Sequence, residues 1–86
     1  MKIKQGYLLR EIAGKTVALP ADDTLELNTM ITLNETGAFL WKRLQNQTTE
    51  DELVNALLAE YDVTREKAAL SVAAFVQKLD ENGFLE

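Results

Sequence analysis

The sequence contains no cysteine and no histidine among its 86 residues. The absence of cysteine excludes a disulfide framework and a thiolate zinc site. Without either residue the common pairs of nucleophile and base cannot be assembled. Ser71 is the single serine, and it falls inside an expected helix with no base to activate it. We therefore expect a protein that is not an enzyme and that holds no metal and no cofactor.

The chain also lacks an excess of basic residues and a long hydrophobic run. Nine basic and 14 acidic residues give a net charge of −5, which argues against a nucleic-acid partner. The longest uncharged run, residues 68–77, is far shorter than the roughly 20 apolar residues of a membrane span. No apolar core of a signal peptide follows Met1 and Lys2. We expect one cytoplasmic domain over residues 1–86, without a membrane partner.

The first third of the chain has the composition of a small antiparallel sheet. Residues 6–12 and 16–19 are rich in strand-forming residues, and Gly14 between them supplies the positive φ of a tight hairpin turn. Pro20 has no N–H to donate and ends the second strand. A third strand is expected within residues 25–33.

The remainder of the chain has the pattern of three helices. Asn34, Thr49 and Thr64 each stand where a side chain can cap a helix, and Thr49 forms a capping box with Glu52. The last helix should end at 82–83, an Asn-Gly pair. The sequence therefore predicts an α+β fold, a three-stranded antiparallel sheet followed by three helices.

Two features have structural explanations as well as functional ones. Trp41 lies beside Leu40 and Leu44 at helical spacing, which favours a core position over a ligand platform. The acidic pairs and triplets at residues 22–23 and 50–52 fit a turn and a helix start better than a cation site.

The third strand is the first candidate for function. Its surest part, residues 29–33, carries no charge and no proline. An open sheet edge of this kind can accept an extended peptide, whose main chain gives affinity and whose side chains give specificity. The alternative is an edge that is paired internally or in a homodimer. The expected strand partners are Thr29, Met30, Ile31, Thr32 and Leu33.

The third helix offers a second candidate surface. Lys67, Ser71, Ala74 and Lys78 fall along one flank at helical spacing. This flank is either a solvated surface or the wall of a groove that attracts an acidic peptide.

Residues 33–41, LNETGAFLW, closely resemble the LNxTGxxxW segment of the PqqD family. Residues 9–14 are similar to the first hairpin of that family, and residues 59–63 to the end of its second helix. Phe75, Leu79 and the run 83–85 are similar to its closing helix and terminus, so the resemblance covers nearly the whole chain.

The resemblance implies a winged helix-turn-helix-like domain called a RiPP recognition element. Such domains bind the leader of a ribosomally synthesised precursor peptide and present it to a modifying enzyme, often a radical SAM protein. In the family the leader adds as a strand beside the third strand and lies against the third helix. This places the peptide on residues 29–33, with Ser71, Phe75 and Lys78 as groove residues. The pathway is pyrroloquinoline quinone (PQQ) synthesis or another of this type.

Two other classes of protein remain as alternatives. A winged-helix nucleic-acid binder is disfavoured, because the basic residues of the third helix are balanced by acidic ones. A structural adaptor, in which a homodimer pairs its own sheet edges, is the other. The sequence suggests one test of the peptide mechanism, which is that proline at Ile31 should abolish binding.

Overall fold

The fold begins with a β-hairpin, in a computed structural model that describes residues 1–20 and 31–86. Strand β1 (Tyr7–Ile12) pairs antiparallel with β2 (Lys15–Pro20), and Ile12 lies opposite Lys15. The two-residue connection has positive φ at both positions, 53° at Ala13 and 79° at Gly14. This is the backbone of a type I′ turn, whose twist matches that of the flanking strands. The hairpin and its turn at Gly14 follow the sequence prediction, and β2 extends to Pro20, the last described residue before residue 31.

Strand β3 (Ile31–Leu33) completes a sheet of order β1-β2-β3. It runs antiparallel to β2, with Thr16 opposite Leu33 and Ala18 opposite Ile31. The predicted strand partners Thr29 and Met30 lie outside the described residues. Among the described strands, β3 therefore has a partner on one side only.

Three helices follow, each with the predicted cap. Asn34 caps α1 (Glu35–Arg43), Thr49 caps α2 (Glu50–Glu60) and Thr64 caps α3 (Arg65–Glu81). In each case the side-chain oxygen accepts a backbone N–H three residues later, which satisfies one of the donors left free at a helix start. The α+β architecture of three strands and then three helices is confirmed.

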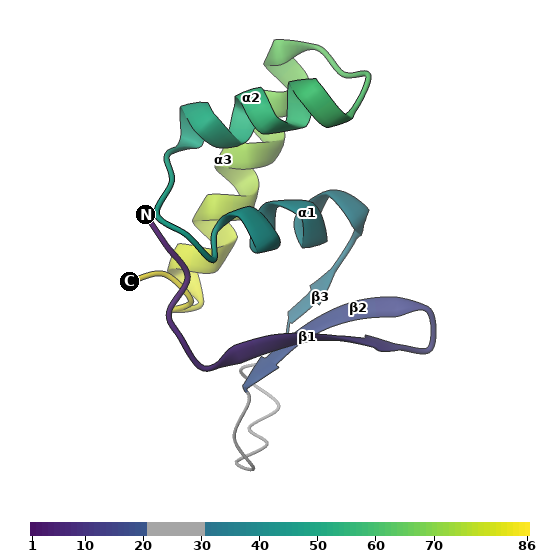
Figure 1. The fold of residues 1–86 in the computed structure, drawn as a ribbon, viewed down its shortest axis with the longest axis vertical. Coiled ribbons are helices and arrows are strands. Elements are labelled where there is room, and N and C mark those ends of the chain that lie inside the picture. The colour runs from purple at the N-terminus through teal and green to yellow at the C-terminus, as the bar shows by residue number, and fades with distance from the viewer. Residues whose placement is uncertain (21–30) are drawn as a thin grey trace.

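The core lies between the sheet and all three helices. Trp41 is 1% exposed, so its predicted place in the core is confirmed. Its ring lies edge-on to Tyr7 and Phe84, with centroid distances of 6.1 and 5.5 Å. Figure 1 shows the sheet at one end of the molecule and α2 at the other, with α3 running between them.

The two ends of the chain pair with each other, and we call residues 1–4 and 84–86 the terminal seam. Ile3 forms an isolated antiparallel bridge with Leu85. The Lys4 N–H donates to the Phe84 carbonyl at 2.8 Å, and the Glu86 N–H to the Lys2 carbonyl at 2.9 Å. Phe84 is buried, and its N–H donates to the Leu79 carbonyl in the last turns of α3 at 2.9 Å. The N- and C-termini therefore lie close together (Figure 1).

Candidate functional site

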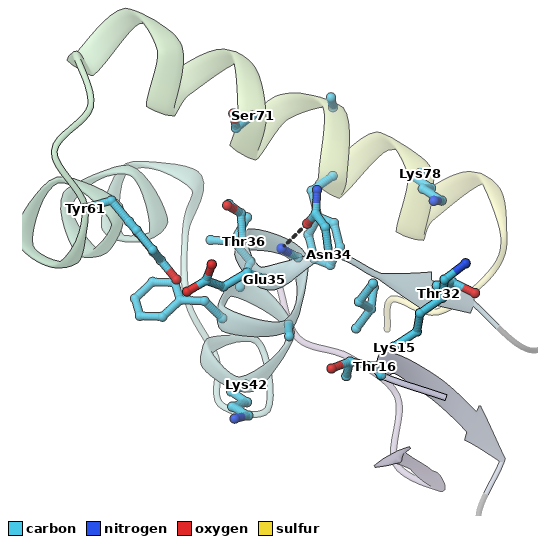
Figure 2. Close-up of a pocket in the computed structure, with 18 residues that line it drawn as sticks. Lys15, Thr16, Thr32, Asn34, Glu35, Thr36, Lys42, Tyr61, Ser71 and Lys78 are labelled. Carbon is cyan, nitrogen blue, oxygen red and sulfur yellow. Dashed lines mark hydrogen bonds between the residues drawn. The ribbon is translucent and has the colours of Figure 1, made fainter. Parts of the chain in front are cut away.

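A groove of about 1040 Å³ opens beside the outer edge of β3. Its walls come from five parts of the chain: the start of β2, the end of β3, α1, Tyr61 at the end of α2, and α3 from Ser71 onward. Figure 2 shows α3 along one side, with Ser71 and Lys78 on it, and β3 with Thr32 facing it across the groove. Polar and apolar side chains both line this space. An extended segment of another chain would therefore meet a sheet edge and a helix flank together.

The register determines which backbone groups of β3 point away from β2. In a type I′ turn the Ile12 carbonyl accepts the Lys15 N–H, so this pair is hydrogen-bonded. Bonded and non-bonded pairs alternate, so Thr16 and Ala18 direct their backbone groups toward β3. Their partners Leu33 and Ile31 accordingly face β2. The N–H and C=O of Thr32 must then point outward, where an added strand could bond them.

The floor of the groove rests on a close approach between α1 and α3 at Gly37. A Cβ at Gly37 would lie 3.3 Å from Cε1 of Phe75 and 3.1 Å from Oδ1 of Asn34. The Gly37 N–H donates to that same Oδ1 at 2.7 Å. Glycine therefore allows the Phe75 ring to pack over the capped first turn of α1, next to Leu33. This contact explains why the LNxTG segment contains glycine, and it holds Phe75 half-buried in the groove.

An aromatic pair and a carboxylate form one end of the groove. Tyr61 closes the end of α2, and its ring meets Phe39 edge-on with a centroid distance of 5.6 Å. The Arg43 guanidinium lies over the other ring of the pair, 5.1 Å from the centroid of Phe39. Desolvation raises the pKa of the Tyr61 phenol above 10.0, and the carboxylates of Glu35 and Glu60 add to this effect.

Most of the described residues predicted for the site meet at this groove. Thr32 and Leu33 line it from the sheet, and Ser71, Phe75 and Lys78 line it from α3. Ile31 lies beneath them in the core, 6% exposed. Lys67 does not line the groove, although it shares a helical flank with Lys78. Lys67 belongs to the first turn of α3, whereas the lining residues of this helix begin one turn later.

The wall contributed by α1 and α2 was missed by the sequence analysis. It includes Glu35, Thr36, Phe39 and Lys42 of α1 together with Tyr61. One signal was available, because Asn34 caps α1 directly after β3 and must place the first turn of this helix at the end of the strand. Residues 33–37 of the LNxTG segment end β3 and start α1, and they also form groove wall.

The described residues show neither a metal cluster nor a membrane span. Within residues 1–20 and 31–86, no three acidic side chains come close enough to hold a metal ion together. The helices of the same residues are too short or too polar to cross a membrane.

One family model and two solved structures match this chain. The sequence model of "Coenzyme PQQ synthesis protein D (PqqD)" matches residues 15–85. A solved structure described as "TbiB1 in Complex with the TbiA(beta) Leader Peptide" is similar over 100% of this chain and 95% of its own, with a TM-score of 0.76 and 27% identity. Another, "Lasso peptide synthetase B1 complexed with the leader peptide", is similar over 96% and 93%, with a TM-score of 0.71 and 25% identity. No curated protein matches the chain. Since the family match spans most of its length, this chain belongs to the PqqD family.

Proposed function

We propose that this chain binds the leader segment of a ribosomally synthesised precursor peptide and presents it to a modifying enzyme. The leader adds as a strand to the open edge of β3 and lies against α3. The chain acts as an adaptor, and a radical SAM protein is the first candidate for the enzyme. The precursor belongs to PQQ synthesis or to another pathway of ribosomal peptide modification. The chain carries out this role in the cytoplasm.

One observation carries the proposal: the outward backbone of Thr32 faces a groove whose other wall is a helix. Strand addition needs free main-chain donors and acceptors, together with pockets for alternate side chains. The two similar solved structures are both described as complexes with a leader peptide. The adaptor role also accords with the residue inventory, because no cysteine or histidine is present to act as nucleophile or base.

The test compares two substitutions at Thr32. Thr32→Pro removes the outward N–H, while the bonds between β2 and β3 at Ile31 and Leu33 stay in place. Thr32→Val is the matched control, since it keeps the N–H and the β-branched shape. Circular dichroism and urea unfolding check that both variants fold.

The ligand is a fluorescein-labelled leader peptide of a small precursor encoded beside this gene, titrated by fluorescence anisotropy. We expect a Kd near the micromolar range for the wild type, about −8 kcal/mol. The Kd of Thr32→Val should stay within about threefold of the wild-type value. Thr32→Pro should bind at least about tenfold more weakly, because one main-chain hydrogen bond and its neighbours are lost. Full affinity in folded Thr32→Pro would exclude strand addition. No binding by the wild type, alone or with the enzyme encoded beside it, would overturn the proposed function.

A further inference from the structure

The groove is positively charged, in contrast to the chain as a whole. The net charge of the protein is −5. Of the described residues, those that line the groove include three lysines, Lys15, Lys42 and Lys78, and a single carboxylate, Glu35. All four side chains are exposed and can therefore meet a ligand.

These charges are separated along the groove. Figure 2 shows Lys78 of α3 and Lys15 of β2 toward the same end as Thr32, and Glu35 with Tyr61 toward the opposite end. The effect of Glu35 on the pKa of the Tyr61 phenol agrees with this neighbourhood. Lys42 lies two turns beyond Glu35 along α1, on the side away from α3 (Figure 2). The two ends of the space between β3 and α3 thus carry charges of opposite sign.

This inference rests on the proposed peptide binding and specifies which peptides bind. We infer that the groove selects a peptide strand with an acidic side chain at the Lys15–Lys78 end and a basic side chain at the Glu35 end, and that this charge order sets the direction of the strand. Main-chain bonding alone can accept a strand in parallel or antiparallel direction. Complementary charges suppress the wrong direction and fix the register.

The length of the groove gives the spacing of the two charges. Ser71 and Lys78 are about two helical turns apart, roughly 10 Å along α3. An extended peptide covers that distance in about three residues, and side chains on one face recur at every second residue. The acidic and basic residues of the ligand should therefore stand about two to four positions apart.

The experiment uses a phage library that displays random twelve-residue peptides, selected on the wild type and on two variants. The charge-swapped variant carries Lys15→Glu, Glu35→Lys and Lys78→Glu. The control variant, Lys4→Glu, changes the net charge by the same amount at an exposed residue that does not line the groove. Selected peptides, and versions with the acidic and basic residues exchanged, are then titrated by fluorescence anisotropy at low and high salt.

The wild type and Lys4→Glu should prefer one charge order by about tenfold, and the charge-swapped variant should prefer the exchanged order. The preference should shrink in high salt, because these charges are exposed. Equal affinity for both orders, or the same preference in all three proteins, would overturn the inference and leave peptide binding intact. If selection on the folded wild type yields no binding peptide, the proposed function fails together with the inference.

Discussion

The terminal seam and the groove differ in whether their backbone groups are paired with another strand. At the seam, residues 1–4 and 84–86 satisfy each other's backbone groups, and the Phe84 side chain is buried against Trp41 and Tyr7. At the groove, the outward backbone of Thr32 has no strand partner among the described residues, and Phe75 is only half-buried. Under the proposed function, this small domain keeps one sheet edge for its peptide, and its stability is concentrated at other contacts. Substitutions of buried side chains at the seam should therefore change stability, and substitutions at the groove should change binding.

The largest effect is expected at the seam. Phe84→Ala removes a buried ring that lies 4.9 Å from Tyr7 and 5.5 Å from Trp41 between centroids. We expect the free energy of unfolding to fall by about 3–5 kcal/mol, because a cavity remains in the core. Urea denaturation measures it, and Leu70→Ala, at a side chain 66% exposed, should change it by less than about 0.5 kcal/mol. A fall in the free energy of unfolding of less than about 1 kcal/mol for Phe84→Ala would contradict the prediction that the terminal seam stabilises the fold.

A smaller stability effect and a larger binding effect are expected at the floor of the groove. Phe75→Ala and Val76→Ala both truncate half-buried apolar residues of α3, but only Phe75 lines the groove. Each should lower the free energy of unfolding by about 1–2 kcal/mol, since these side chains are partly exposed already.

Peptide affinity separates the two variants. In anisotropy titrations Phe75→Ala should weaken leader binding by about tenfold, whereas Val76→Ala should stay within about twofold. Equal losses in the two variants would mean that α3 acts through its general stability and not through the Phe75 ring.

The smallest effect concerns the boundary of the groove on α3. Lys67→Glu should change peptide affinity by less than about twofold, because Lys67 lies in the first turn of the helix and does not line the groove. Lys78→Glu makes the same change of charge within the lining and should reduce the affinity for an acidic peptide several-fold. Similar losses for both lysines, measured in the same titration, would show that the whole flank attracts the peptide.

Local signals in the sequence were enough to predict the elements of the fold. The caps at Asn34, Thr49 and Thr64 and the turn at Gly14 depend on interactions within a few residues, so their positions follow from spacing alone. The core position of Trp41 follows from its helical neighbours. The α+β order of strands and helices could therefore be predicted before any tertiary contact was known.

The groove depends on contacts that spacing does not reveal. Lys67 and Lys78 are equivalent on the flank of α3, and only the packing of α1 beside the later turns distinguishes them. The wall at Glu35 and Tyr61 joins two helices that the sequence analysis treated as separate.

The position of a proline test also depends on register. The sequence suggested proline at Ile31, but the pairing of Ile31 with Ala18 directs its N–H toward β2. Proline there would damage the sheet itself, so the informative position is Thr32.

The bridge between Ile3 and Leu85 has a consequence for the order of events in folding. It closes a loop that contains nearly every other residue of the chain, and the entropy cost of closing a loop rises with its length. The hairpin turn and the helical caps, by contrast, close over a few residues each. We expect the bridge to form late in folding. The strands β2 and β3 and the helix α1 should assemble first, while the two ends of the chain are still apart.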